Sequence, residues 1–242
     1  MKVYINNHDY LTWPRAMADI LAKQGHEPIF VDNASTYEPL LRYYDEECEY
    51  EVVRLGWNWG HTAPWRYIDA ITLNREAYVV TDPDLDISGI PSDWEFALKE
   101  GLVRYLGAPK CGFSLDETRV PSKNPSWIED GFYKYPDGNP RVWGRRLPGS
   151  MCHFFDYPVD TTFAMYRKGN GWSQASGIRT DRPYTARHLP WHIVLDVDPK
   201  EDTLQIPMDD EIYYYFTHAN ASSLTRKRME PMLKEYVGRM VA

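Results

Sequence analysis

Cysteine is scarce in this sequence, and long apolar segments are missing from it. The 242 residues include three cysteines, Cys48, Cys111 and Cys152. An odd number without metal-site spacing argues against a disulfide framework and indicates reduced thiols packed as small hydrophobic side chains. No apolar run is long enough to span a bilayer, and the first residues do not resemble a signal peptide. We therefore expect a protein without a transmembrane segment that stays in the cytoplasm of the producing or host cell.

Positive charge is also in deficit, because 27 lysines and arginines face 35 aspartates and glutamates, a formal net charge of -8. Nucleic-acid binding depends on neutralising phosphates with lysine and arginine, so this balance argues against a general affinity for nucleic acid. Two basic clusters, at 141–146 and 225–228, are interpreted as solvated surface, with capture of an acidic ligand as the alternative. The composition, 43% hydrophobic and 14% aromatic, suffices for one substantial core and favours a single α/β domain.

The N-terminal residues have the pattern of a β-α-β unit. Residues 3–5 read as a short buried strand, residues 6–9 as a polar loop, and residues 14–23 as an amphipathic helix. Residues 28–31 form a second strand that runs directly into a polar segment, Asp32-Asn33-Ala34-Ser35-Thr36. A polar segment at the carboxyl end of a parallel strand is where open α/β sheets bind ligands.

A second pair of elements follows and ends in an acidic run. We expect a strand over residues 50–55, which leads to Asn58-Trp59-Gly60, and then a helix over residues 64–74. The strand at 78–81 ends in three carboxylates at alternate positions, Asp82, Asp84 and Asp86. Carboxylates held close together need a compensating cation, and oxygen ligands of this kind suit Mg2+ or Mn2+ bound to a diphosphate. The alternative is a solvated acidic turn.

This ordered set of motifs resembles the nucleotide-sugar-dependent glycosyltransferases of the GT-A fold, bacterial and viral members of family 2 type especially. The resemblance covers the first half of the chain and returns at residues 159–167 and 186–191. It implies an α/β fold of Rossmann type, with a mixed, mostly parallel sheet flanked by helices. It also implies that residues 1–110 bind the nucleotide sugar and that residues 111–242 bind the acceptor.

The resemblance assigns roles to individual residues. Asp32, Asn33 and Ser35 would contact the nucleotide through uracil and ribose, Asp82 would face the ribose or the metal, and Asp84 would ligate the metal that bridges the diphosphate. Asp86 is ambiguous, since Asp84-Leu85-Asp86 is itself an Asp-x-Asp motif. The remaining candidates are Asn6, Asn58 and Gly60 for the nucleotide, His188 as a further metal ligand or a structural histidine, and His8 and His61 as possible linings of the nucleotide pocket.

The second half of the chain supplies the candidates for acceptor chemistry. A direct displacement needs a carboxylate that removes the acceptor proton, and Asp160 is the first choice, with Asp156 second. A turn or capping role is the alternative for either residue. The Glu-Asp pair of many inverting members is missing, which leaves the stereochemistry open. The aromatic residues of the segment 121–148 either stack on sugar faces or pack beneath the loop: Trp127, Phe132, Tyr133, Tyr135 and Trp143.

The sequence therefore predicts a metal-dependent glycosyltransferase that moves a sugar from a nucleotide sugar, a UDP-sugar by preference, to a hydroxyl acceptor. Inversion is favoured, and a retaining transferase is an alternative. The other alternative is a carbohydrate- or nucleotide-binding protein without catalysis on a degenerate GT-A scaffold. A nucleotidyltransferase is a weaker interpretation, because residues 6–9 are not the glycine-rich, basic segment expected after its first strand.

Overall fold

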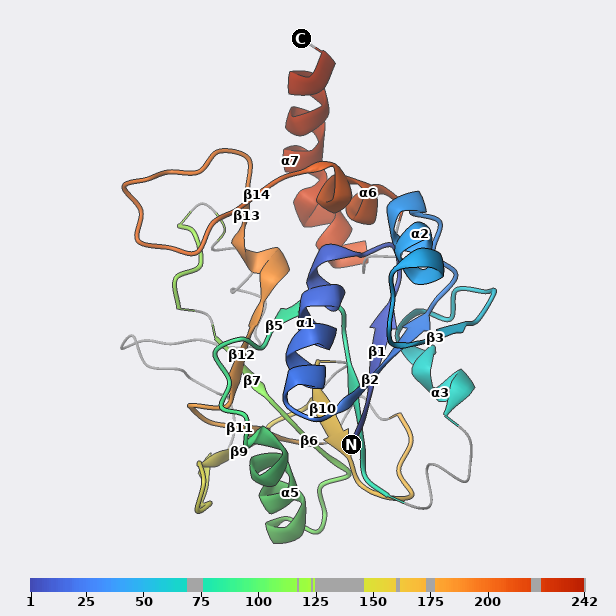
Figure 1. The fold of residues 1–242 in the computed structure, drawn as a ribbon. Helices are drawn as coiled ribbons and strands as arrows, with labels where there is room; N and C mark the ends of the chain where they lie inside the picture. Colours follow the sequence, from blue (N-terminus) through green and yellow to red (C-terminus); the bar gives the residue numbers. More distant parts are fainter. Residues whose placement is uncertain are drawn as a thin grey trace.

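The computed structural model describes residues 1–68, 76–116, 118–122, 124, 146–159, 162–172, 177–218 and 223–241. Its elements surround one large sheet (Figure 1). No helix in these ranges is both long and apolar enough to cross a membrane. The helices are α1 (Thr12–Lys23), α2 (Glu38–Glu46), α3 (Pro64–Tyr67), α5 (Trp94–Arg104), α6 (Asp210–His218) and α7 (Ser223–Val241), with short 3-10 helices η1 (Gly60–Thr62) and η3 (Leu189–His192).

Nine strands form the large sheet, in the order β3-β2-β1-β4-β10-β6-β11-β9-β8. Two small sheets, β5-β12-β7 and β13-β14, lie beside it. The strands are β1 (Lys2–Asn7), β2 (Glu27–Asp32), β3 (Glu51–Arg54), β4 (Tyr78–Thr81), β5 (Leu85–Asp86), β6 (Lys110–Gly112), β7 (Ser114–Leu115), β8 (Arg146–Leu147), β9 (Phe154–Asp156), β10 (Ala164–Tyr166), β11 (Ile178–Thr180), β12 (Thr185–His188), β13 (Ile193–Val194) and β14 (Ile206–Pro207).

The prediction of an α/β fold with a mixed sheet is confirmed, but the sheet is not mostly parallel. The four strands β3, β2, β1 and β4 are parallel throughout. Beyond β4 the direction changes, because β10 is antiparallel to β4 and β6, β11 is parallel to β6, and β9 is antiparallel to β11 and β8. The sequence resemblance extends continuously only over the parallel side, and short strands of two or three residues on the other side show too little periodicity to reveal their direction.

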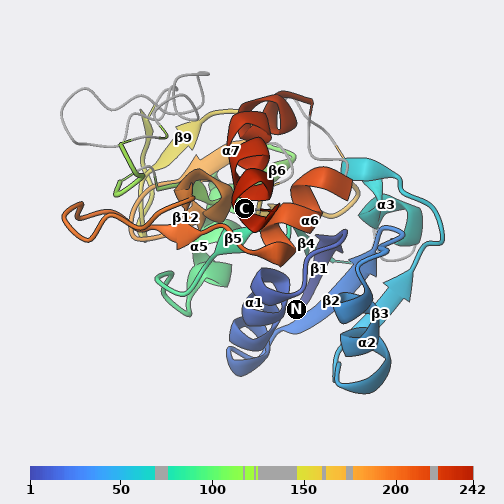
Figure 2. The ribbon, with the colours of Figure 1, turned by 90° about the horizontal axis from the view of Figure 1, so that it is seen from above.

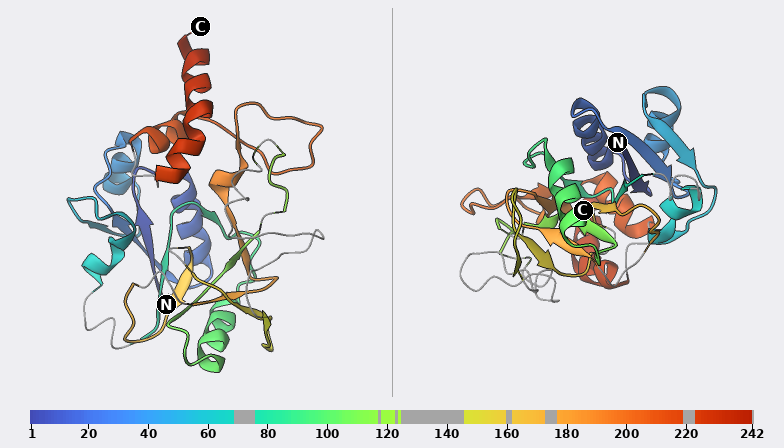
Figure 3. Two further views of the ribbon diagram at one scale, coloured as in Figure 1. Left: turned by 180° about the vertical axis from the view of Figure 1, so that it is seen from behind. Right: turned by 90° about the horizontal axis from the view of Figure 1, so that it is seen from below.

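Helices cover both faces of the parallel side. Alternate residues of β1 point to opposite faces: Val3 and Ile5 join a core with α1, α2 and α5, whereas Tyr4 packs in a second core beneath α3. Viewed from above, the strands run between α1 and α2 on one side and α3 on the other (Figure 2). The view from behind shows α3 on the face of the sheet opposite to α1 and α2 (Figure 3).

The predicted helices exist with somewhat different ends. The first helix begins at Thr12 rather than residue 14, and α3 ends at Tyr67. The rest of the helix predicted to reach residue 74 lies largely outside the described residues. A third core joins α6 and α7 to β13 and to the segment after β1, so the C-terminal helices stand above the carboxyl ends of β1 and β2 (Figure 1).

Candidate functional site

The strand order has a topological switch point between β1 and β4, where the connections leave in opposite directions across the sheet. From β1 the chain moves outward through β2 and β3, and then returns to place β4 on the other side of β1. Ligands of open α/β sheets bind at the carboxyl ends of the strands at such a point. The parallel register pairs Asn7 with Asp32 and Ile5 with Thr81. The polar segments after β1, β2 and β4 therefore meet at one edge.

An amide network joins the predicted nucleotide-binding residues on the β2 and β3 side. The Asn33 side chain donates to Asn58 Oδ1 at 3.0 Å and to the Gly60 carbonyl at 3.1 Å. It accepts from the Trp59 backbone N–H at 2.6 Å, and Asn58 Oδ1 accepts from the Gly60 N–H at 2.8 Å. The Asn6 side chain reaches the same Gly60 carbonyl at 3.3 Å. The structure thus brings these predicted residues together, although they come from β1, from the loop after β2 and from the loop after β3.

Asp32 ends β2 in a nearly buried position. Its Oδ1 accepts from the Ser35 backbone N–H at 3.3 Å, and its carbonyl accepts from Leu55 N–H at 3.0 Å. Burial raises the pKa of the Asp32 carboxyl, while hydrogen bonds from Ser35 and the charge of Arg54 oppose that rise. A buried carboxylate beside a network of side-chain amides is suited to accept hydrogen bonds from a nucleoside.

Asp9 shapes the loop between β1 and α1, a role that sequence reasoning missed. It is buried and adopts a left-handed backbone conformation, with φ of 57°. Its Oδ1 accepts from the backbone N–H groups of Thr36 and Tyr37, and its own N–H donates to Ser35 Oγ at 2.9 Å. The carboxylate therefore ties the loop after β1 to the loop after β2. Its place in a polar stretch beside Asn7 and His8 was the only signal in the sequence.

The acidic side of the site is built by Asp84 and His188. Asp84 Oδ2 lies 3.5 Å from His188 Nε2, and the Asp84 carbonyl accepts from Leu189 N–H at 3.0 Å. Antiparallel pairing of β5 with β12, which sets His188 opposite Leu85, holds the two side chains at this distance. The Trp191 ring packs against the His188 ring, with centroids 4.9 Å apart. Residues separated by more than a hundred positions are brought together here.

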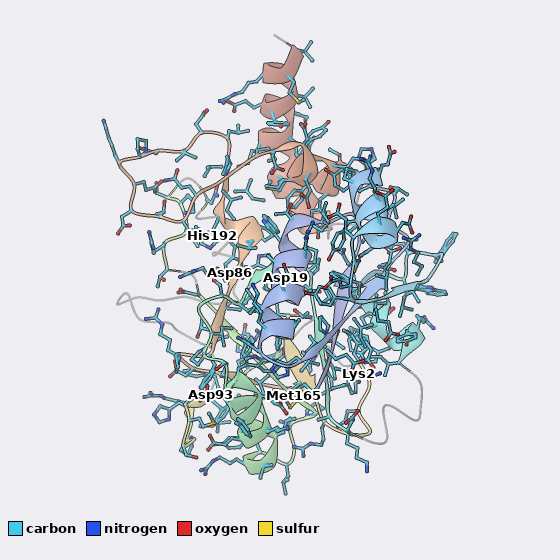
Figure 4. The ribbon with its side chains drawn as sticks, in the orientation of Figure 1. Lys2, Asp19, Asp86, Asp93, Met165 and His192 are labelled. Carbon is cyan, nitrogen blue, oxygen red and sulfur yellow. The ribbon has the colours of Figure 1, made fainter. Side chains whose placement is uncertain are left out.

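The other two carboxylates of the acidic run differ from Asp84. Asp86 Oδ2 pairs with Arg187 Nη1 at 3.2 Å, and its Oδ1 accepts from Ser88 N–H at 2.8 Å. Figure 4 labels Asp86 at the edge where β5 meets β12. These contacts give Asp86 a structural role in joining the two strands. Asp82 is half-buried directly after β4, on the same turn as Asp84.

The residues that fit a divalent cation are few. Within the described ranges, no group of three or more histidine, cysteine, aspartate or glutamate side chains is arranged to hold a metal ion. Asp84 and His188 supply a carboxylate and an imidazole side by side, with Asp82 next to them in sequence. Mg2+ and Mn2+ sites commonly use one or two carboxylates and complete their coordination with phosphate oxygens and water. This donor set therefore fits a metal that arrives with a diphosphate.

Helix α6 covers this edge of the sheet, a position that the sequence did not predict. The Tyr215 ring packs against the Tyr10 ring with centroids 4.3 Å apart. Burial raises the pKa of the Tyr215 phenol, and the negative charges of Asp84 and Asp82 raise it further. Tyr214 OH lies 2.9 Å from Thr36 Oγ1. The helix thus touches the loop after β2 and lies beside the acidic run.

Buried polar atoms without a hydrogen-bond partner among the described residues concentrate at this edge. Native proteins leave few such atoms unpaired, since each costs free energy, and a cluster of them points to a bound ligand, ion or water. The atoms at this edge are Asn6 Oδ1, Asn7 Oδ1, His8 Nδ1, Tyr10 OH and His188 Nδ1.

Of the two predicted catalytic carboxylates, Asp156 is the one that the structure describes, and it lies away from this site. Asp156 is exposed on β9, and β10, β6 and β11 lie between β9 and β4. Four strand spacings, roughly 19 Å, therefore separate it from the strand before Asp84. Asp160 lies outside the described residues, as do the five aromatic residues of the segment 121–148 named above. The neighbouring Val159 is buried, and β10 begins at Ala164 opposite Val80 of β4.

Comparison of the sequence with known protein families and with curated proteins finds no match. The residues and the geometry of this edge are therefore the basis for assigning a function.

Proposed function

We propose that this chain is a metal-dependent glycosyltransferase of the GT-A type that transfers a sugar from a nucleotide sugar, a UDP-sugar by preference, to a hydroxyl acceptor. One observation carries the proposal. Buried polar residues around Asp32 and a carboxylate–imidazole pair, Asp84 and His188, lie at the same edge of the sheet, across the switch point. The predicted residues of both groups occupy that edge.

The separation of the two groups suits a nucleoside diphosphate. β1 lies between β2, which ends at Asp32, and β4, which precedes Asp84. Two strand spacings, roughly 10 Å, therefore separate them, a length that a nucleoside diphosphate can bridge. The polar atoms of β1 and of the loop after it that lack partners among the described residues lie along this path. Asp32, Asn33 and Asn58 would hold the nucleoside end.

Asp84 and His188 would hold the cation at the diphosphate end, with Asp82 as a further oxygen donor. A bound divalent cation offsets the negative charge that develops on the leaving diphosphate. The carboxylate that removes the acceptor proton is proposed to be Asp160, with inversion favoured and retention as the alternative. Asp156 is too far from β4 for this role unless the acceptor site spans the sheet.

The alternative is a nucleotide- or carbohydrate-binding protein without catalysis on the same scaffold. One observation favours it: the part of the chain that the structure describes contains no cluster of three potential metal ligands. In that case the contact between Asp84 and His188 is structural, and nucleotide binding is independent of metal.

A calorimetric panel of nucleoside diphosphates, with Mn2+ or with chelator, tests the proposal. We expect UDP to bind more tightly with Mn2+, and Asp84→Asn to lose that dependence, because Asp84 supplies an oxygen ligand. Asp202→Asn, an exposed carboxylate paired with Arg119 at 3.0 Å, is the matched control. Release of UDP from a UDP-sugar is measured in parallel. Equal affinity with and without metal, and no release by the folded protein, would favour the binding protein.

A further inference from the structure

The amide network beside Asp32 has a fixed hydrogen-bond polarity. Side-chain amides can be placed either way round unless a group of known polarity selects one orientation. Here the backbone N–H of Trp59 can only donate, so the atom of Asn33 that it meets is Oδ1. The backbone N–H of Gly60 likewise identifies Asn58 Oδ1. Both amides are therefore oriented by backbone donors.

The network ends on the imidazole of His8. Because Oδ1 of Asn58 faces Gly60 and Asn33, its Nδ2 must be the atom that lies 3.2 Å from His8 Nε2. An amide nitrogen only donates, so Nε2 accepts and the ring proton is on Nδ1. Asp9 Oδ2 is also near Nε2, but at 3.4 Å it is farther away than Asn58 Nδ2 at 3.2 Å; the N–H groups of Thr36 and Tyr37 donate to the other oxygen of Asp9, Oδ1. The shorter contact, from Asn58, decides the tautomer.

The Nδ1–H group of His8 is consequently a buried donor with no acceptor in the described part of the chain. The parallel register sets Asn7 opposite Asp32, so His8 follows β1 at the level where Asp32 ends β2. A donor on His8 and a carboxylate acceptor on Asp32 therefore lie at the same edge of the sheet. Pairs of this kind discriminate between ligands, since a wrong partner leaves buried polar groups unpaired.

We propose that His8 is a specificity-determining residue that, together with Asp32, selects nucleobases carrying a ring N–H next to a carbonyl, as in uracil. This inference rests on the proposed function. The carbonyl would accept from His8 Nδ1–H, and the ring N–H would donate to the Asp32 carboxylate. Cytosine presents the reverse pattern, a ring nitrogen acceptor next to an amino donor. It would set a lone pair against Asp32 and a donor against His8.

The tautomer is tested first, on the ligand-free protein. Long-range 15N–1H correlation spectra of the seven histidines, with His8→Asn used to assign the His8 signals, report which ring nitrogen carries the proton. We expect a proton on Nδ1 and a bare Nε2 at neutral pH. A proton on Nε2, alone or with one on Nδ1, would overturn the inference whatever the protein binds.

Base selection is tested by the ratio of UDP to CDP affinity in Mn2+, measured by calorimetry. We expect the parent protein to prefer UDP by at least about tenfold, the effect of one mispaired hydrogen bond to a charged group. His8→Leu should bring the ratio close to one, whereas His8→Asn, whose amide can donate from the Nδ1 position, should keep most of it. His153→Leu, an exposed histidine before β9, is the control.

The outcomes separate the two proposals. Selective UDP binding that His8→Leu abolishes, without turnover of any nucleotide sugar, would support the role of His8 and contradict the transferase. Turnover with a UDP to CDP ratio that His8→Leu leaves unchanged would support the transferase and overturn the role of His8. If no nucleoside diphosphate binds to the folded protein, both proposals fail.

Discussion

At the scale of single residues, the buried carboxylate of Asp32 lowers the stability of the fold, although it serves the proposed binding site. Burial raises the pKa of its carboxyl above the usual 3.8. The ionised form is therefore less favourable in the folded state than in the unfolded chain. The contribution of Asp32 to the stability of the fold is therefore fully present below the pKa that its carboxyl has in the unfolded chain. It is lost as the pH rises through the higher pKa of the folded state. At neutral pH, Asp32 consequently destabilises the protein that it serves.

We expect Asp32→Asn to raise the melting temperature at neutral pH, because the amide fills the same space without a buried charge. The advantage over the parent should shrink as the pH is lowered toward 4. Thermal melts across this pH range measure it, with the exposed Asp45→Asn as control. Nucleotide affinity should fall in the same variant. A lower melting temperature for Asp32→Asn at every pH would show that the carboxylate stabilises the fold instead.

At the scale of elements, α5 packs against the sheet at a glycine. A Cβ added at Gly101 would lie 2.7 Å from Cys111 Sγ and 2.8 Å from a ring carbon of Phe154, and both of these side chains are buried. Alanine in place of glycine favours a helix by about 1 kcal/mol, whereas overpacking of a core costs about 1–3 kcal/mol. The cost of overpacking outweighs the gain in helix propensity, so glycine is the residue that fits where α5 meets β6.

Gly101→Ala should therefore lower the free energy of unfolding by up to about 2 kcal/mol, the difference between these two effects. Gly238 in α7 provides the matched control, because a Cβ there meets no atom within 4 Å. Gly238→Ala should stabilise the protein by up to about 1 kcal/mol. Urea unfolding of both variants measures the difference. Similar stabilities for the two would mean that the core beneath α5 yields without cost.

Helix α6 caps the first turn of α1 from a distance. The helix α1 has no side-chain cap of its own and no acidic residue in its first turn. Glu211 instead accepts from the backbone N–H groups of Leu11 and Thr12, at 2.6 and 2.8 Å, and from Thr12 Oγ1. A carboxylate at this end satisfies unpaired donors and interacts favourably with the helix dipole.

We predict that Glu211→Ala costs about 0.5–2 kcal/mol in the free energy of unfolding, the range for a lost helix cap. Glu230→Ala, which breaks an exposed pair with Lys234 on α7, should cost less than about 0.5 kcal/mol. Hydrogen exchange should also show faster opening of the first turn of α1 in the Glu211 variant. Unchanged exchange there would contradict a capping role.

At the scale of the whole molecule, β1 joins the three hydrophobic cores. Val3 and Ile5 belong to the first, Tyr4 to the second, and Tyr10, just after the strand, to the third. Loss of any one core should therefore loosen the strand that the others need. This arrangement predicts a single cooperative unfolding transition for the chain.

Phe216, fully buried in the third core, tests that cooperativity. We expect Phe216→Ala to lower the stability of the entire protein by about 3–5 kcal/mol, the usual cost of removing a buried aromatic ring. Far-UV circular dichroism and tryptophan fluorescence should follow one shared transition in urea. Two separate transitions, with the C-terminal helices unfolding first, would show that the third core is an independent unit.

The parallel half of the fold could be derived from the sequence alone. Its strands are apolar runs bounded by Gly, Pro and polar residues, and these local signals predicted β1, α1, β2, β3 and β4 in order. The same signals placed Asp32, Asn33, Asn58 and Asp84 at strand ends, because a parallel sheet aligns its carboxyl ends on one edge. The local sequence pattern was therefore sufficient to locate those site residues that lie at the ends of parallel strands.

The features that depend on contacts between distant residues became known only from the tertiary structure. The antiparallel strands beyond β4, the distance of Asp156 from the site, the pairing of Asp86 with Arg187 and the covering of the site by α6 join residues far apart in the chain. No periodicity of 2.0 or 3.6 residues encodes such pairings, because they depend on how whole elements pack. The contact of His8 with Asn58 is a further example, because it depends on backbone donors at Trp59 and Gly60 that orient the amides of Asn33 and Asn58, and the sequence could not place these groups side by side.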